Sequence, residues 1–417
     1  MFKLDICRPD HLFASAWGVA VAGYTLAFGA PSVEVLLWIT LFAIFFWCGA
    51  ICSYLVPVPV PAKLAAKTRV PGLGVAVVVL SGVSIYYAFQ VISYILGSGI
   101  GILALAEIRQ AALGGDPVIA NGNTLITAVQ MNFCLALLGY IHEKTALLAP
   151  DRQASGITTK RDRRRVRRFF VCAALSLLIS LLDGSRAFFL MGAICVVISQ
   201  LIIGVYRLRR AVLFCVVFIT VFSVTFPFVR PEVESAFDGF KYTMVYFAGG
   251  VGSLDYALAG EVRVYWQDFE VIMNKLGGLI PGLGGYDLSV LRMDMVDLAS
   301  GLQTNVFTAL GVYNEYLGAA TAPFAVLTGA FLTFIGRRAR RSAGYLFIYA
   351  FYAAATVLSL FHEYYLATSY LLFKVGVVVL VLRVLAACCG IAASLFRSAL
   401  GACDDGGVEQ GQGRLPS

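Results

Sequence analysis

Apolar runs of about twenty residues follow one another along nearly the whole chain, with polar stretches between them. A helix of roughly 20 apolar residues crosses a bilayer core of about 30 Å. About ten segments have this character: 11–29, 34–56, 72–97, 123–142, 168–183, 187–206, 211–229, 305–335, 343–361 and 365–385. Because lipid cannot hydrogen-bond an open strand edge or loop, the pattern predicts an all-α, polytopic transmembrane helix bundle.

One polar connection, residues 230–304, is much longer than most of the others. Loops of roughly 75 residues are usually ordered or functional, and we expect short helices in it around Pro231–Phe247 and Val262–Leu276. Its glycine clusters, such as Gly249–Gly252, lack the preceding strand and the Gly-Lys-Ser/Thr ending of a phosphate loop. We interpret them as sites of loop flexibility and close packing.

The domain organisation that follows is simple. A single transmembrane domain is predicted over residues 1–400, with 230–304 as its one large loop on one face. The tail, residues 401–417, is rich in Gly and Asp and is expected to be disordered.

Composition supports a membrane protein rather than a soluble one. The 417-residue chain is 59% hydrophobic and 13% charged, and its mean hydropathy is +0.82. A soluble domain would have about a quarter of its residues charged. The chain therefore lacks the polar surface that a water-soluble protein of this size needs.

Basic residues predict the orientation. They cluster on alternate connections, at Lys63–Arg69, Lys160–Arg168, Arg207–Arg210 and Arg337–Arg341. By the positive-inside rule these connections are cytoplasmic, which places both termini in the cytoplasm and the 230–304 loop on the outer face of the membrane. The net charge of +8 is thereby assigned to orientation and to contact with anionic lipid headgroups. Nucleic acid is not an expected partner.

Cysteines and histidines predict neither a disulfide nor a metal site. The ten cysteines fall in apolar segments or inner regions, and no structural disulfide is implied. The three histidines, His11, His142 and His362, are scattered without metal-ligand spacing. We expect no cofactor.

The few basic residues on the predicted outer face are the first candidates for chemistry, since guanidinium suits phosphate and carboxylate. Arg186 ends the tight turn Asp183-Gly184-Ser185-Arg186. It either pairs with Asp183 or clamps a diphosphate at headgroup level. The other candidates for substrate binding are Arg230, Lys241, Arg263 and Arg292, each of which could instead be a snorkelling or solvated charge.

A second group of candidates lies around the eighth and ninth segments. Asn305, Thr308 and Glu315 share one arc if residues 305–335 form a continuous helix. Glu315 would then lie roughly 15 Å along that helix and face a wet cavity or a partner. His362 is the only outward-facing histidine and is a candidate general base near neutral pH, or an interfacial anchor. Lys374 lies inside the tenth segment, where it snorkels outward or reaches a lipid diphosphate.

Two short stretches carry a resemblance to a known family. The segment Asn305-Val306-Phe307-Thr308 followed by Tyr313-Asn314-Glu315-Tyr316-Leu317-Gly318 resembles the Asn-x-Tyr-Thr…Tyr-x-Asp-Phe-Gly pattern of Wzy-type O-antigen and oligosaccharide repeat-unit polymerases. The Gly184-Ser185-Arg186 turn and the single large outer loop resemble features of the same family. The chain departs from the pattern at Phe307, where the motif has Tyr, and at Glu315-Tyr316, where it has Asp-Phe.

The resemblance implies a GT-C-like glycosyltransferase of a bacterial inner membrane, with its active site on the periplasmic face. Such an enzyme transfers a growing glycan from undecaprenyl diphosphate to the sugar end of an incoming lipid-linked repeat unit, without a metal or nucleotide sugar. It implies catalytic roles for Glu315 and Arg186, and it adds Tyr313 to the substrate-binding residues. The acceptor hydroxyl of such a reaction needs a base, for which His362 is a further catalytic candidate. A protein that regulates chain length is a further expected partner.

Two other functions remain open. An O-antigen ligase has the same fold but moves a finished glycan to another lipid. A transporter or flippase of lipid-linked oligosaccharide belongs to a different class, for which internal repeats and helices broken at mid-membrane are typical. The sequence has no clear internal repeat.

Overall fold

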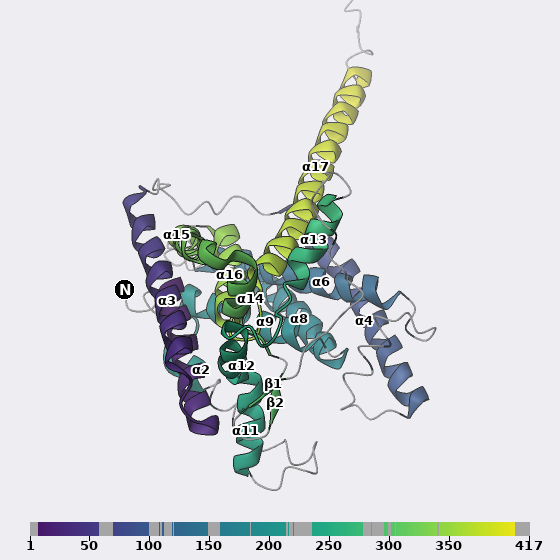
Figure 1. Cartoon of the computed structure of the whole chain (residues 1–417). Coiled ribbons are helices and arrows are strands. Elements are labelled where there is room, and N and C mark those ends of the chain that lie inside the picture. Colours follow the sequence, from purple (N-terminus) through teal and green to yellow (C-terminus); the bar gives the residue numbers. More distant parts are fainter. Residues whose placement is uncertain are drawn as a thin grey trace, which may run out of the picture.

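The fold comes from a computed structural model. It describes residues 7–57, 70–99, 108, 111, 119, 121–148, 159–183, 185–213, 216, 220, 236–277, 285, 296–298, 302–304, 306–339 and 342–404. Almost all of the ordered elements are helices (Figure 1). They are α2 (Pro9–Phe28), α3 (Val33–Leu55), α4 (Leu73–Ser98), α6 (Gly122–Leu147), α8 (Lys160–Leu182), α9 (Arg186–Ile203), α11 (Ala236–Phe247), α12 (Gly249–Leu258), α13 (Gln267–Gly277), α14 (Ala309–Leu317), α15 (Thr321–Ala339), α16 (Ala343–Leu358) and α17 (Tyr365–Asp404).

The predicted all-α architecture is confirmed, and the helices follow the apolar segments of the sequence. Within the described residues, six helical stretches are long and apolar enough to cross a membrane: α2, α3, α4, α6, Ala309–Ala339 and Tyr365–Cys389. The apolar helices in α9 and α16 are shorter, and α8 begins in the basic run. Most of segment 211–229 lies outside the described residues. These apolar helices fit a multi-pass membrane protein, and the total of ten spans stays a prediction.

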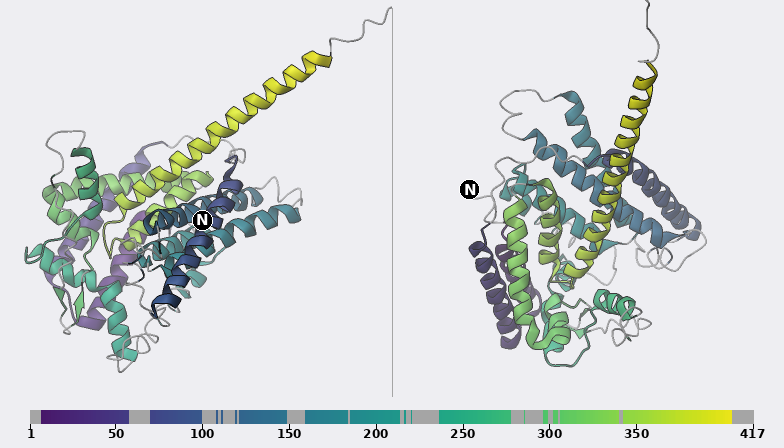
Figure 2. Two further views of the ribbon diagram at one scale, coloured as in Figure 1. Left: turned by 90° about the vertical axis from the view of Figure 1, so that its right-hand side faces the viewer. Right: turned by 90° about the horizontal axis from the view of Figure 1, so that it is seen from above.

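Helix α17 is longer than its apolar segment. It runs for 40 residues, and its later part extends away from the other helices in each view (Figures 1 and 2). Residues 401–404, assigned to a disordered tail from the sequence, belong to this helix. The rest of the predicted tail, 405–417, lies outside the described residues.

Two glycines let α3 and α15 pack backbone against backbone. A Cβ atom on Gly49 would lie 1.9 Å from the Val326 carbonyl oxygen, and one on Gly329 would lie 2.1 Å from that of Phe46. Small residues allow such close approach between apolar helices, where dispersion replaces the hydrophobic effect as the main attraction. This contact anchors α15, and with it α14, against the N-terminal helices.

The described part of the long 230–304 connection, or insertion, packs on the bundle. It contains α11, α12, α13 and an antiparallel pair of two-residue strands, β1 (Val296–Asp297) and β2 (Gln303–Thr304). Both predicted short helices are confirmed: α11 is described from Ala236, and α13 starts about five residues later than expected. Buried residues of α11 and α12 share one apolar core with α2, α3 and α14.

The glycines of α12 confirm the interpretation of close packing. A Cβ atom on Gly250 would lie 2.4 Å from the Leu360 carbonyl oxygen, and one on Gly252 would lie 2.8 Å from the Tyr24 ring. These contacts bring the insertion directly against the 359–364 turn and α2. The sequence predicted close packing of these glycines. It did not predict that they lie within a helix, where loop flexibility is not their role.

The eighth segment is not one continuous helix, contrary to the sequence prediction. Thr308 has extended backbone and is the N-cap of α14, its hydroxyl oxygen accepting from the Gly311 N–H at 3.3 Å. Gly318, with φ of +49°, ends α14, and a short 3₁₀ turn, Gly318–Ala320, leads into α15. The common helical arc predicted for Asn305, Thr308 and Glu315 is therefore wrong, because the helix starts only at Ala309.

Substituting alanine for a helical glycine distinguishes the α3–α15 contact from an open position. In an unhindered helix, Gly→Ala stabilises by about 0.5–1 kcal/mol. We expect that gain at Gly82, where a Cβ meets nothing within 4 Å. Gly329→Ala should instead lower the midpoint of thermal unfolding in detergent, because the helices must separate. A Gly329→Ala protein as stable as Gly82→Ala would contradict the packing.

Candidate functional site at a buried carboxylate

The turn between α16 and α17, residues 359–364, is where the bundle and the insertion meet. The Ser359 carbonyl oxygen accepts the first N–H of α14, that of Ala309, at 2.9 Å. The Ser359 hydroxyl oxygen accepts from Trp17 Nε1 of α2 at 3.1 Å. These bonds place the turn at the base of α14 and beside α2, so that side chains from distant parts of the chain surround it.

Glu363 lies at the centre of this junction and is only 1% exposed. Trp266 Nε1, just before α13, donates to its Oε2 at 3.0 Å. The hydroxyl of Tyr313, on α14, donates to Oε1 at 3.2 Å. The backbone N–H groups of Tyr365 and Leu366 donate to the same carboxylate at 2.8 and 3.2 Å. We call Glu363, these two aromatic side chains and these two N–H groups the Glu363 cluster.

The local chain direction explains part of this geometry. Tyr365 and Leu366 are the first residues of α17, and the first N–H groups of a helix have no intrahelical partner. A carboxylate placed just before the helix satisfies two of them and interacts favourably with the positive end of the helix dipole. The two aromatic donors then complete the shell around the carboxylate oxygens.

Burial raises the pKa of Glu363 from 4.5 to about 7, although all the hydrogen bonds of the cluster act in the opposite direction. The loss of hydration on burial therefore destabilises the charged carboxylate more than the hydrogen bonds from the four donors stabilise it. A carboxyl group with this pKa is partly protonated at neutral pH. Such a group can accept a proton and release it again without a large penalty in either direction.

His362, next to Glu363, behaves differently from the sequence prediction. Burial lowers its pKa from 6.5 to about 4, and a hydrogen bond with the Phe307 backbone opposes this only weakly. The ring is therefore neutral at physiological pH. The prediction that His362 titrates near neutrality is wrong, because the ring is largely withdrawn from water; Glu363 is the group that titrates there.

An aromatic cluster with a second buried carboxylate adjoins the site. Trp266 stacks on Phe269, with ring centroids 4.9 Å apart, and contacts Tyr316 edge-on at 5.9 Å. The Tyr316 hydroxyl donates a short hydrogen bond to Glu270. Trp266 itself is buried and donates to Glu363, which helps to hold that carboxylate in place.

Some of the sequence candidates gather at this junction. Thr308, Tyr313 and His362 all lie within it: Thr308 and Tyr313 are buried, and His362 contacts the Phe307 backbone. Tyr313, predicted from the sequence to bind substrate, does lie at the site. There its hydroxyl donates a hydrogen bond to Glu363.

Other candidates lie elsewhere. Glu315 is exposed on α14, and its role facing a wet cavity or a partner stays a prediction. Arg263 is exposed, with its guanidinium over the Tyr265 ring at 5.3 Å. Lys374 Nζ lies over the Tyr370 ring at 4.2 Å, on α17. Lys241 is half-buried on α11.

Arg186 is the first residue of α9, but its side chain lies outside the described part of the chain, as do Arg230, Arg292 and Asn305. The preceding Asp183 is fully buried, and its Oδ1 accepts from the Ser185 N–H at 2.8 Å. Met191 of α9 contacts Thr368 of α17, Sδ to Oγ1, at 3.9 Å. Arg186 and Glu363 each precede this contact by only five residues, so the start of α9 and the turn before α17 both lie near it.

Sequence reasoning missed Glu363 and Glu270 as site residues. For Glu363 a signal existed, because a carboxylate next to a histidine at the end of an apolar segment has to be solvated or paired. For Glu270, in the insertion, no signal distinguishes it from the exposed acids around it. Its burial depends on Tyr316, which is 46 residues away in the chain.

Comparison with known protein families, with curated proteins and with solved structures finds no match for this chain. Among the described residues, no three His, Cys, Asp or Glu side chains gather in a way that could hold a metal ion.

The two perturbed groups of the turn affect stability in opposite directions. The folded state holds the Glu363 proton more tightly than the unfolded state does, so this contribution to stability is full below about pH 4.5 and is lost by about pH 7. The folded state holds a His362 proton less tightly, so stability from that group rises between about pH 4 and 6.5. In the wild type the two effects largely offset each other.

Glu363→Gln should remove the contribution of Glu363 to the pH dependence of stability. Relative to wild type, the variant is expected to gain stability as pH rises from about 4.5 to 7, by up to roughly 3 kcal/mol, since a pKa change of one corresponds to about 1.4 kcal/mol. Thermal unfolding in detergent across this range measures the difference. Glu261→Gln, at an exposed carboxylate of the insertion, is the control and should follow wild type. A constant difference between Glu363→Gln and wild type would contradict the raised pKa.

Proposed function

We propose that this chain is a membrane glycosyltransferase of the polysaccharide-polymerase kind. It would transfer a growing O-antigen or exopolysaccharide chain from undecaprenyl diphosphate to the non-reducing-end sugar of an incoming lipid-linked repeat unit. The observation that carries the proposal is a buried carboxyl group with a pKa of about 7 at the junction of the apolar bundle and the long insertion. The motif resemblance at 305–318 and 184–186 supports the same activity.

The reaction needs a base and an anion-binding group. The acceptor hydroxyl oxygen attacks the anomeric carbon, the bond from that carbon to the diphosphate oxygen breaks, and the hydroxyl proton passes to a base. A general base works best when its pKa is near the operating pH. By that criterion Glu363, at about 7, is better suited than His362, at about 4.

Access to Glu363 requires a local opening, because Trp266 and Tyr313 cover it. Trp266 immediately precedes α13, and we propose that displacement of this segment admits the acceptor sugar. Loops that close over a substrate and exclude water are common in enzymes. The aromatic residues beside Trp266 would then offer apolar faces to a sugar ring.

For the diphosphate, we propose Arg186. It begins α9 five residues before the contact between Met191 and Thr368, and Glu363 precedes that contact by the same number of residues. The N-terminus of a helix favours an anion through its free N–H groups. A guanidinium there would stabilise the charge that develops on the leaving group. Such a contact is worth on the order of 3 kcal/mol in the transition state.

We propose that this end of the bundle faces the periplasm, with both termini in the cytoplasm. Arg337 supports this arrangement: its guanidinium donates to the carbonyl oxygens of Ser53 and Val56, joining two of the connections predicted to be cytoplasmic. A protease site inserted at residues 299–301 that is cleaved only from the cytoplasmic side of intact cells would overturn the orientation.

Arg186→Ala is expected to abolish long polymer while single lipid-linked repeats accumulate. The purified protein is incubated with lipid-linked repeat units, and the products are separated by chain length on a gel. Arg209→Ala, at an exposed arginine of the 207–210 cluster, is the matched control and should polymerise normally. Normal chain length in a well-folded Arg186→Ala protein would contradict the proposal.

The same assay separates the two alternative functions. Transfer of a finished glycan to another lipid, without polymer formation, would indicate a ligase. Movement of the lipid without new glycosidic bonds would indicate a flippase.

Glu363→Gln is expected to lower the turnover number by about a hundredfold, the lower end of what a general base contributes. The wild-type rate should rise with pH through about 7, as Glu363 loses its proton, and the residual rate of the variant should lack this rise. Glu261→Gln should keep the wild-type profile. A variant that keeps the wild-type rise with a reduced rate would show that another group is the base.

A further inference from the structure

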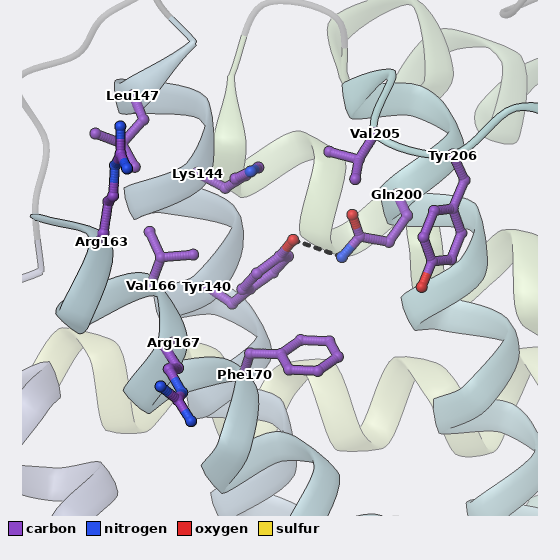
Figure 3. Close-up of a pocket in the computed structure, with 10 residues that line it drawn as sticks. All are labelled: Tyr140, Lys144, Leu147, Arg163, Val166, Arg167, Phe170, Gln200, Val205 and Tyr206. Carbon is purple, nitrogen blue, oxygen red and sulfur yellow. Dashed lines mark hydrogen bonds between the residues drawn. The ribbon is translucent and has the colours of Figure 1, made fainter. Parts of the chain in front are cut away.

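A cavity of about 390 Å³ lies at the far end of α9 from the Glu363 cluster. It is formed by the last turns of α6, the first turns of α8 and the turn that follows α9 (Figure 3). Gln200, on its wall, is 14 residues beyond Arg186, about 20 Å along the helix axis. The cavity and the candidate active site are therefore separated by most of the thickness of a bilayer core.

The turn after α9 builds one wall of the cavity. Gly204 has φ of +85° and ends the helix in the left-handed conformation. The chain then folds back, and the N–H groups of Val205 and Tyr206 both donate to the Gln200 carbonyl oxygen, at 2.9 and 3.2 Å. A glycine at this position permits the reversal, which places Tyr206 opposite α6 and α8.

Gln200 and Tyr140 form a polar pair at the inner end of the cavity. Gln200 is 3% exposed, and its Nε2 donates to the Tyr140 hydroxyl at 2.5 Å. Among the described residues, Gln200 Oε1 is buried without a hydrogen-bond partner. Tyr140, having accepted from Gln200, retains its own O–H proton for donation. A buried acceptor and an adjacent donor lining one cavity are the arrangement expected where a polar ligand binds.

The charge of the cavity is positive. Its described lining includes Lys144, Arg163 and Arg167 and no acidic residue, and both arginines are exposed. Neither Lys144 nor Arg167 forms a salt bridge within the described residues. In Figure 3 Lys144 lies about one turn from Tyr140 on the same helix. Cations beside phenol and amide groups favour an oxyanion that also carries hydroxyl groups.

The remaining walls are apolar and open toward the outer surface of the helices. Phe170 and Val205, both lining residues, are 39% and 37% exposed, and the Phe170 ring packs against Tyr140 with centroids 5.5 Å apart. A cavity of this volume is in the range that holds a drug-sized ligand and greatly exceeds an inorganic phosphate. A buried polar pair, flanked by cations and opening past apolar side chains, fits an amphiphile.

We propose that this cavity binds the phosphate headgroup of an anionic phospholipid. Lys144 and Arg167 bind the phosphate oxygens, and Tyr140 donates to one of them. Gln200 Oε1 accepts from a headgroup hydroxyl, and the acyl chains leave past Phe170 and Val205. Basic pockets between membrane helices bind lipid headgroups in this way. The proposal is independent of the glycosyltransferase activity.

The test measures lipid retained by the purified full-length protein. Native mass spectrometry follows wild type after exchange into an equal mixture of phosphatidylglycerol and phosphatidylcholine. We expect wild type to retain phosphatidylglycerol preferentially. In the double variant Lys144→Met, Arg167→Met this preference should fall about tenfold or more, since each cation near a lipid headgroup contributes several-fold to affinity. Arg209→Met, an exposed arginine outside the cavity, should keep it.

One further variant and three contrary outcomes also test the proposal. Tyr140→Phe removes one oxygen and little volume, so a several-fold loss of preference in this variant supports the proposal even if the double variant fails to fold. Equal losses in Arg209→Met and the double variant would overturn it in favour of general surface charge. Displacement of phosphatidylglycerol by millimolar inorganic phosphate would identify a free-phosphate site and overturn it too. Equal retention of the two lipids by the wild-type protein would also overturn the proposal.

Discussion

The burial of one carboxylate organises the junction at which the rest of the site is built. Glu363 is almost fully withdrawn from water, and an unpaired carboxylate there would be far too costly. Its oxygens are bonded by an indole, a phenol and two main-chain N–H groups. These donors come from the insertion, from α14 and from α17. The requirement to satisfy Glu363 therefore ties together three parts of the chain that are separate in sequence.

The same carboxylate helps to explain why the described part of the insertion packs on the bundle. Trp266 can reach Glu363 only if the chain before α13 packs against the start of α17. Gly250, on α12, provides the second attachment by approaching the Leu360 carbonyl oxygen. A third comes from Ser32 in the α2–α3 turn, whose hydroxyl donates to Asp255 at 2.8 Å. Polar contacts and glycine contacts together fix the insertion on one end of the bundle, with its aromatic residues over the buried acid.

The two ends of α9 carry different chemistry. Just before its start is the buried Asp183, and the backbone of Arg186 begins the helix near the contact with α17, five residues after Glu363, whose pKa burial raises to about 7. Near its end, Gln200 lines a cavity together with Tyr140 of α6, and the charged residues of its described lining are all basic. A helix of 18 residues spans about 27 Å, close to the thickness of a bilayer core. One short helix thus separates a site suited to proton transfer from one suited to holding an anion.

The apolar pattern by itself determined that the described chain is predominantly helical and where most helices lie, because twenty apolar residues in lipid have no alternative to intrahelical hydrogen bonds. It also located two helices of the insertion and the close packing of the Gly249–Gly252 glycines. Tertiary structure decided what periodicity could not. Thr308 is an N-cap rather than a helical residue, so it shares no helical face with Glu315, and burial lowers the pKa of His362 while it raises that of Glu363. The physical reason is that a pKa and a side chain's environment depend on desolvation by neighbours far away in the chain, such as Trp266 and Tyr313, and no local pattern records those neighbours.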